Sequence, residues 1–241
     1  MGDPTGAGIS RFYYWIGSVA VAIAITIIGF VVVTATMIAI GELLTHALDS
    51  SVGDWDRSVA EFFSRHRSSA LNSITKRATS GVGSLLRVRH ASLPAMIVAA
   101  IVVAILARRG YWREGAFIAI AFALEFTSYR TIVHFVERQR PHVFDLDRYP
   151  STTSYPSGHT AAATVLFVGI MLIVMRTTGN TVARVLTAIV AVAATAMVGF
   201  ARVYRGSHSL VDVLAGVLLG LACLAVAAVA VGAMREPDAT T

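Results

Sequence analysis

The 241-residue sequence is poor in charge and in cysteine, and both shortages exclude classes of protein. Charged residues make up 14% of the chain, against about 25% in soluble globular domains, so we do not expect a soluble enzyme. Cys223 is the only cysteine, which excludes an intramolecular disulfide framework. No internal repeat, low-complexity segment or linker divides the chain, and we therefore expect one domain over residues 1–241.

The sequence is rich in long uncharged apolar runs, and 56% of its residues are hydrophobic. Runs of this length predict an all-α integral membrane protein, a bundle of six transmembrane helices. The first run is longer than the core of a signal peptide and is expected to stay as a membrane span. The predicted spans are residues 13–40, 91–107, 114–136, 158–176, 184–203 and 208–234.

The longest polar stretch, residues 41–90, separates the first two spans. Asp54, Trp55, Asp56 and Phe62 alternate acidic with aromatic character there, a pattern that favours amphipathic helices lying at the membrane interface. We expect this interfacial segment to serve mainly as a connection.

Three polar clusters stand where predicted spans begin or end. The first follows the third span, the second opens the fourth, and the third joins the fifth to the sixth. Because successive membrane helices alternate in direction, all three clusters are expected on one side of the membrane. They are Arg138 with Arg140; Ser157, Gly158 and His159; and Arg202, His208 and Asp212.

The third cluster has the most informative spacing. His208 and Asp212 are four residues apart at a helix start and share a face. A carboxylate there can fix the imidazole tautomer and leave the other ring nitrogen as a base or nucleophile. The guanidinium of Arg202 suits a phosphate. Taken alone, the same residues are equally typical of ordinary polar capping at a helix N-terminus.

The other two clusters add an anion cradle. Backbone N–H groups at Ser157 and Gly158 open a helix and allow an anion to approach closely, while His159 can deliver a proton to a leaving oxygen. Arg138 and Arg140 can bind phosphate, although arginines at a membrane edge are more often interfacial anchors.

The charge distribution indicates the partner and the orientation. The net charge is +6, but the basic residues are scattered between apolar runs, which favours anionic lipid head groups or a phosphorylated substrate over nucleic acid. Five arginines in the turns 108–113 and 176–184 predict that this face is cytoplasmic. We therefore expect the site on the non-cytoplasmic face of a bacterial plasma membrane. The sequence indicates no oligomeric state.

The combined motifs resemble the three-part signature of the type 2 phosphatidate phosphatase (lipid phosphate phosphatase) superfamily, which also includes vanadium haloperoxidases. The resemblance covers roughly residues 50–230 and is carried by Arg140-Pro141, by Pro156-Ser157-Gly158-His159, and by Arg202, His208 and Asp212 in their spacing. It implies metal-independent hydrolysis of a phosphomonoester or diphosphate, with no cofactor. It also implies roles for individual residues: His208 as nucleophile, Asp212 as its orienting group, His159 as proton donor, and Arg140, Arg202, Ser157 and the Gly158 amide as holders of the phosphoryl oxygens.

The chain departs from that signature at two positions. Val133 stands where the family has a lysine, seven residues before Arg140. Arg130 and His134 are the neighbouring candidates for the missing charge, and our hypothesis is that Arg130 supplies it. Ala201 replaces the serine that usually precedes the arginine of the third motif.

The leading interpretation is a lipid-phosphate phosphatase acting on phosphatidate, phosphatidylglycerol phosphate or a polyprenyl diphosphate. A phosphotransferase that uses the same phosphohistidine is the alternative enzyme. A non-catalytic anion-binding membrane protein is the third interpretation, supported by Glu125 and Arg130 within a predicted span. No Asp, Glu and His residues have metal-ligand spacing, so no metal site is expected.

Overall fold

The structure, a computed structural model, describes residues 4–85, 93–147 and 153–234. Within these ranges the regular structure is helical and contains no strand, so the all-α prediction is confirmed. Two short π-helical segments, η1 (Leu43–Ala47) and η2 (Asp49–Gly53), follow the first helix. The α-helices are α1 (Pro4–Glu42), α2 (Asp54–Arg65), α3 (Ser69–Leu85), α4 (Leu93–Arg108), α5 (Trp112–Phe135), α6 (Gly158–Thr177), α7 (Thr181–Tyr204) and α8 (Leu210–Ala233).

Five segments are long and apolar enough to cross a membrane, and they correspond to five of the six predicted spans. The second predicted span corresponds to α4, whose 16 described residues reach about 24 Å at 1.5 Å per residue, less than the roughly 30 Å of a hydrocarbon core. The protein is therefore an integral membrane bundle with one short apolar helix. The five segments are Trp15–Ala47, Trp112–Phe135, Gly158–Thr177, Thr181–Tyr204 and Leu210–Ala233.

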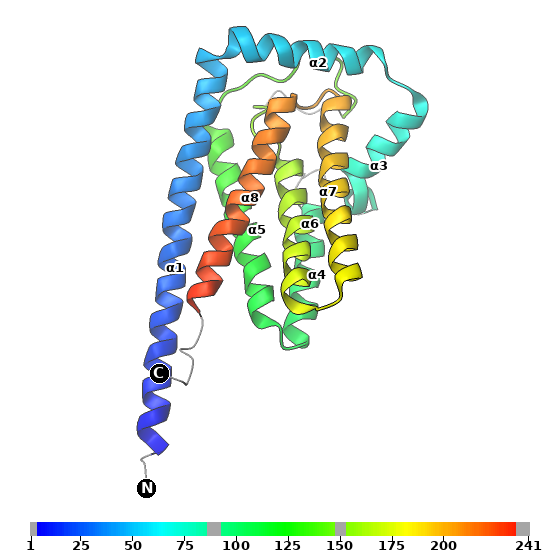
Figure 1. Ribbon diagram of the computed structural model, residues 1–241. Helices are drawn as coiled ribbons and strands as arrows, with labels where there is room; N and C mark the ends of the chain where they lie inside the picture. Colours follow the sequence, from blue (N-terminus) through cyan, green and yellow to red (C-terminus); the bar gives the residue numbers. More distant parts are fainter. Residues whose placement is uncertain (1–3, 86–92, 148–152, 235–241) are drawn as a thin grey trace.

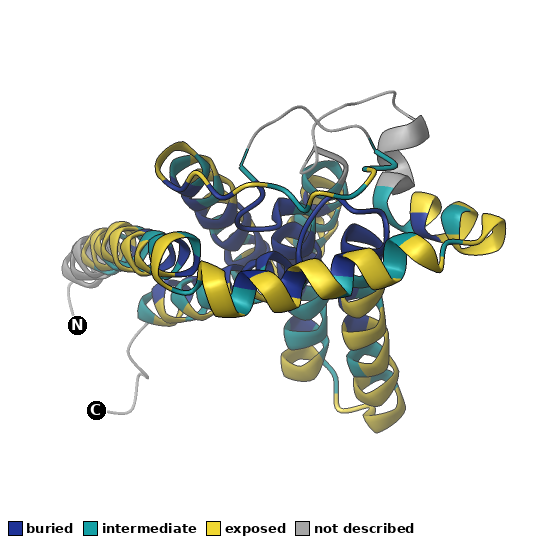
Figure 2. Cartoon of the chain, turned by 90° about the horizontal axis from the view of Figure 1, so that it is seen from above, coloured by how far each residue is buried: buried dark blue, intermediate teal, exposed yellow. Residues whose placement is uncertain are grey.

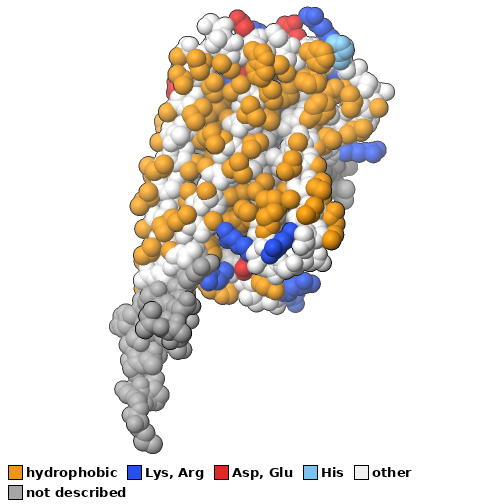
Figure 3. Space-filling view, viewed as in Figure 1, with side chains coloured by type: hydrophobic (Ala, Val, Ile, Leu, Met, Phe, Trp, Pro, Cys, Tyr) orange, Lys and Arg blue, Asp and Glu red, His pale blue; other side chains and the backbone are white. Residues whose placement is uncertain are grey.

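The bundle is arranged around α5, α6 and α8, while α1 runs along one side and α7 along the other (Figure 1). Helix α8 packs against α1, α5 and α6, and α7 packs mainly against α6. Seen from above, the buried residues gather on the central helices and the exposed ones on the periphery (Figure 2). Exposed apolar side chains cover the flank of the bundle and charged ones gather toward its ends (Figure 3), as expected of a surface that faces lipid.

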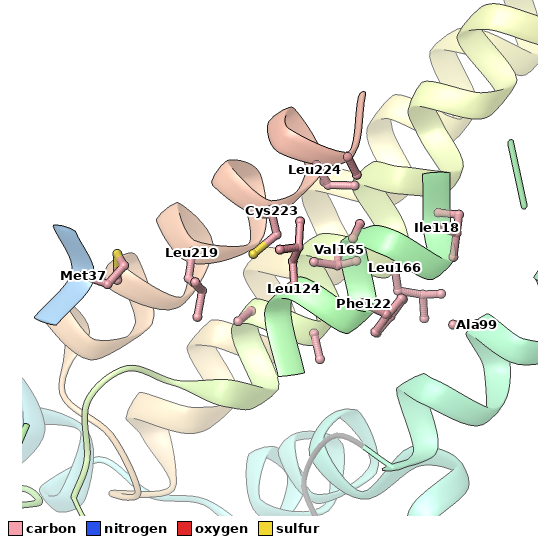
Figure 4. Packing of buried hydrophobic residues seen from close by; sticks show 14 of the residues in the cluster. Met37, Ala99, Ile118, Phe122, Leu124, Val165, Leu166, Leu219, Cys223 and Leu224 are labelled. Carbon is pink, nitrogen blue, oxygen red and sulfur yellow. The ribbon is translucent and has the colours of Figure 1, made fainter. Parts of the chain in front are cut away.

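The core is apolar and closely packed, and one backbone contact in it matters for the site. Buried side chains of α1, α5, α6 and α8, including Met37, Leu124 and Leu219, pack together around the buried Cys223 (Figure 4). Near the end of the bundle, a Cβ on Gly216 would lie 2.5 Å from the carbonyl oxygen of Ser157. The start of α6 and the second turn of α8 therefore touch backbone to backbone, as small residues allow between membrane helices.

Helix α2 confirms the predicted amphipathic segment and crosses one end of the bundle (Figure 1). Asp56 and Ala60, one turn apart, are buried, whereas Trp55 and Phe62 are about half exposed. A buried carboxylate is unexpected in a segment predicted to be mainly a connection, because a charge is buried at low cost only when it is paired.

Candidate active site

The three polar clusters meet at the end of the bundle that α2 crosses, as the alternation of helix directions predicts. The N–H of Ser157 donates to the carbonyl of Asp212 at 2.9 Å, which joins the second cluster to the third. The Nη1 of Arg140 donates to the carbonyl of Ser207 at 2.5 Å, which joins the first cluster to the third. Segments far apart in the chain thus form one polar site.

His208 lies in the turn between α7 and α8 and is 4% exposed. Its Nδ1 lies 2.7 Å from the carbonyl oxygen of Ser154. A carbonyl only accepts, so Nδ1 carries the proton and Nε2 keeps its lone pair. Burial, and then the positive charges of Arg202 and Arg140, hold the pKa of His208 well below its ordinary value. The imidazole is therefore neutral near pH 7 and suited to nucleophilic attack.

Asp212 does not make the contact with His208 that its spacing indicates. Its Oδ2 accepts from the N–H of Ser209 at 2.9 Å, and its Oδ1 accepts from Nη1 of Arg138 at 3.2 Å. Asp212 is the third residue of α8 and forms a reciprocal capping box with Ser209. The carboxylate therefore turns back toward its own helix start, and the Ser154 carbonyl is the group that faces Nδ1.

Arg202 is fully buried at the end of α7, and a carboxylate from the loop before α6 holds it. Asp147 Oδ2 accepts from Arg202 Nη1 at 2.9 Å, and its Oδ1 accepts from Arg205 Nε at 2.7 Å. Burial alone would raise the pKa of Asp147, but the bond from Arg205 and the charge of Arg202 outweigh it and keep that pKa below its ordinary value. Asp147 thus stays ionised and fixes the guanidinium.

The two arginines of the first cluster have different surroundings. Arg140 donates through Nη2 to the carbonyl of Thr153 at 3.3 Å, and burial followed by the charge of Arg202 lowers its pKa. Arg138 instead directs both terminal nitrogens at carboxylates, those of Asp56 at 2.9 Å and Asp212 at 3.2 Å. The structure therefore brings Arg140 near Arg202 and commits Arg138 to ion pairs.

The second cluster opens α6. Ser157 is the residue before the first helical turn, and its hydroxyl lies 3.0 Å from that of Thr160. Gly158 packs under Tyr129, since a Cβ there would lie 2.9 Å from the ring. His159 is partly buried and near enough for its charge to lower the pKa of His208 further. The helix start and both histidines thus face one region, a favourable position for an anion.

Two cavities open beside the arginines. One of ≈ 370 Å³ lies between η1, η2, α2 and the loop after α5, and another of ≈ 720 Å³ lies at the end of α5. Both are lined by Arg138 and Arg140, and the larger also by Val133 and His134. Arg130 is exposed on α5 and lines neither cavity. Of the two candidates for the missing lysine charge, His134 is the one placed beside Arg140.

Sequence reasoning missed three groups that fix the site. Each of them accepts a hydrogen bond from a residue of the predicted site: Asp56 from Arg138, Asp147 from Arg202, and the carbonyl of Ser154 from His208. Two of these groups carried a signal in the sequence. Asp147 is one of the two acidic residues between the first two motifs, and Asp56 is acidic on an otherwise apolar helix face. The Ser154 carbonyl carried none, because any residue supplies one.

The fold and the site define an integral membrane protein whose bundle end presents a histidine, a helix start and guanidinium groups, the donors of a phosphate-type anion site. In the described part of the chain, no group of three or more His, Cys, Asp and Glu residues is arranged to hold a metal ion.

A family model described as the PAP2 superfamily matches residues 114–235, about half of the chain, and the protein belongs to that superfamily. This confirms the resemblance carried by the three motifs. No curated protein matches the sequence. The fold is similar to that of a solved structure, described as the first transmembrane PAP2 type phosphatidylglycerolphosphate phosphatase from Bacillus subtilis. The match has a TM-score of 0.58 and 23% identity, and covers 86% of this chain and 94% of that one.

Proposed function

We propose that the protein is an integral membrane phosphatase that hydrolyses a phosphomonoester or diphosphate of a lipid through a phosphohistidine on His208. One observation carries the proposal: Nδ1–H of a buried, neutral His208 donates a hydrogen bond to the Ser154 carbonyl, which leaves the lone pair on Nε2, near Arg140 and Arg202. Membership of the PAP2 superfamily supports phosphatase chemistry.

The first step forms a bond between Nε2 of His208 and phosphorus and breaks the bond from phosphorus to the lipid oxygen. The negative charge of the bound phosphate favours the protonated form of His159. This imidazolium gives its proton to that oxygen, which leaves as an alcohol or as a lipid monophosphate. Arg140, Arg202 and the start of α6 stabilise the charge that builds on the phosphoryl oxygens. Bonds from Arg140 to the Thr153 carbonyl and from Arg202 to Asp147 hold both guanidinium groups, which supports donors that need little reorganisation.

The second step releases phosphate. His159, now neutral, takes a proton from water, whose oxygen attacks phosphorus and breaks the bond to Nε2. His208 returns to its neutral form and inorganic phosphate leaves. A lipid or sugar hydroxyl in place of water would give phosphotransfer, the alternative enzyme, by the same step.

The substrate classes are phosphatidate, phosphatidylglycerol phosphate and polyprenyl diphosphate. All three place a phosphate at the interface and apolar tails in the bilayer, and the similar structure from Bacillus subtilis is described as a phosphatidylglycerolphosphate phosphatase. The non-cytoplasmic orientation of the site, in a bacterial plasma membrane, stays a prediction.

We expect the purified protein in detergent to release inorganic phosphate from at least one of these lipids, without added metal. EDTA should leave the rate unchanged, because the phosphoryl charge is stabilised by guanidinium and N–H groups in this proposal. Vanadate should inhibit by occupying the phosphoryl site. A phosphate-release assay against the three lipids, with and without EDTA, measures both expectations.

The outcomes separate the competing functions. Lipid binding without phosphate release would support the non-catalytic anion-binding protein, and loss of activity in EDTA would contradict a metal-free reaction. Phosphorylated products that form only when an acceptor alcohol is added would identify the phosphotransferase.

Replacing the two candidates for the missing lysine charge should have unequal effects. We expect His134→Ala to raise KM about two- to fivefold, since an exposed ionic contact is worth about 0.5–1 kcal/mol. Arg130→Ala should leave KM unchanged, because Arg130 lines neither cavity beside Arg140. A higher KM in Arg130→Ala alone would restore the original hypothesis. The measurement is initial rate against lipid concentration in mixed micelles.

A further inference from the structure

The interfacial helix α2 places one carboxylate inside the site. Asp56 is 3% exposed. Its Oδ2 accepts from Nη2 of Arg138 at 2.9 Å, and its Oδ1 accepts from the N–H of Val211 at 3.3 Å. Arg138 uses Nη1 for Asp212 at 3.2 Å. One arginine thus bridges a carboxylate of α2 and a carboxylate of α8.

This bridge is buried along its whole length. Asp56, Arg138 and Asp212 are 3%, 7% and 0% exposed. The two carboxylates repel each other unless Arg138 lies between them, and Arg138 needs their charge because a buried cation without a partner is strongly unfavourable. The position of each group therefore depends on the other two.

Arg138 is also connected to His208 by two hydrogen bonds that pass through the backbone of Ser154. Its carbonyl accepts from the N–H of Ser154 at 2.8 Å. The carbonyl of Ser154 in turn faces Nδ1 of His208 at 2.7 Å. Asp212 caps α8, which begins two residues after His208. Moving Arg138 would therefore disturb both the group that fixes the imidazole tautomer and the helix start that follows it.

We propose that Asp56 is a positioning residue for the reaction. By holding Arg138, it fixes Asp212 and the Ser154 carbonyl, and through them the direction in which His208 presents Nε2. The inference rests on the function proposed above. It also changes the role predicted for Arg138, from a phosphate ligand to a positioning residue, because both terminal nitrogens of Arg138 lie on carboxylates.

Asp56→Asn tests this role, because the amide oxygen still accepts from Val211 while the charge opposite Arg138 is lost. We expect kcat to fall about 10- to 100-fold, by analogy with the loss seen when a hydrogen-bond partner that orients a metal-ligating side chain is removed. KM should stay within about twofold, since Arg140 and Arg202 lie outside this bridge and a loss confined to kcat marks a transition-state effect.

Asp54→Asn is the matched control. It makes the same substitution two residues earlier on α2, at an exposed carboxylate that pairs with Arg57, and its kinetics should equal those of the wild type. Arg138→Gln and the double variant Asp56→Asn/Arg138→Gln complete a cycle. If Asp56 acts through Arg138, the double variant is no slower than Arg138→Gln alone. If the fold-loss in kcat of the double variant equalled the product of the fold-losses of the two single variants, the inference would be overturned.

Folding is checked by thermal unfolding of each variant in detergent. If Asp56→Asn alone does not fold, the double variant is compared with Arg138→Gln, since both lack the Arg138 charge and leave Asp212 in the same state, and they differ only in the carboxylate of Asp56. If neither folds, Asp56 serves folding rather than positioning and the inference is overturned. A folded Asp56→Asn with wild-type kcat overturns it as well. A wild type that releases no phosphate would instead overturn the proposed function.

Discussion

His208→Gln should abolish phosphate release, with an expected loss in kcat of about 10⁴-fold or more, the scale seen when an enzyme loses its nucleophile. The glutamine amide can still donate toward the Ser154 carbonyl, but its nitrogen has no lone pair available for attack. Burial and the nearby arginines keep the wild-type imidazole neutral, so its Nε2 lone pair is available near pH 7 for the attack in the proposed mechanism. The measurement is initial phosphate release by purified wild type and variant in the same detergent.

A second readout identifies the intermediate. Wild-type protein quenched with denaturant during turnover of a ³²P-labelled lipid should carry acid-labile label on histidine, and His208→Gln should carry none. His66→Gln is the control, because His66 is exposed at the end of α2 and lies outside the site. Substantial turnover by His208→Gln, or equal label on it, would rule out His208 as the nucleophile.

The positions of the polar residues between apolar runs predict which of them lie at the same end of the bundle, because apolar segments cross a membrane as helices. Once the runs are read as helices of alternating direction, Arg140, Ser157 and His208 must lie at the same end of the bundle. The fold class follows from the same pattern. The second span follows from the same pattern, since the run 91–107 predicts a helix where the structure describes α4, Leu93–Arg108.

Contacts between distant segments could not be predicted in this way. Asp56 meets Arg138, and Asp147 meets Arg202, across long stretches of chain. These pairs depend on how α2 and the loop before α6 pack on the bundle, which helical periodicity does not determine. Asp212 shows a local limit as well. A spacing of four places it on the face of His208, but the capping box turns its carboxylate toward the helix start.

Gly216→Ala should damage both folding and activity, because the added methyl group has no room. Its Cβ would lie 2.5 Å from the carbonyl oxygen of Ser157 and 3.3 Å from the backbone nitrogen of Ala161. Both neighbours are backbone atoms at the start of α6, in its N-cap residue and its first turn, and cannot rotate away. Overpacking of this kind costs about 1–3 kcal/mol, which outweighs the roughly 1 kcal/mol that alanine gains over glycine within a helix.

The loss of activity should exceed the loss of stability. Separating the starts of α6 and α8 moves Ser157, Gly158 and His159 away from His208, and a misplacement of about 1 Å can cost about 100-fold in rate. Gly232→Ala is the matched control on the same helix, since nothing lies within 4 Å of its Cβ and the substitution should leave the unfolding temperature equal or higher. Thermal unfolding and phosphate release of both variants test this together. If Gly216→Ala retained wild-type turnover, close contact between α6 and α8 would not be what aligns the nucleophile with the anion cradle.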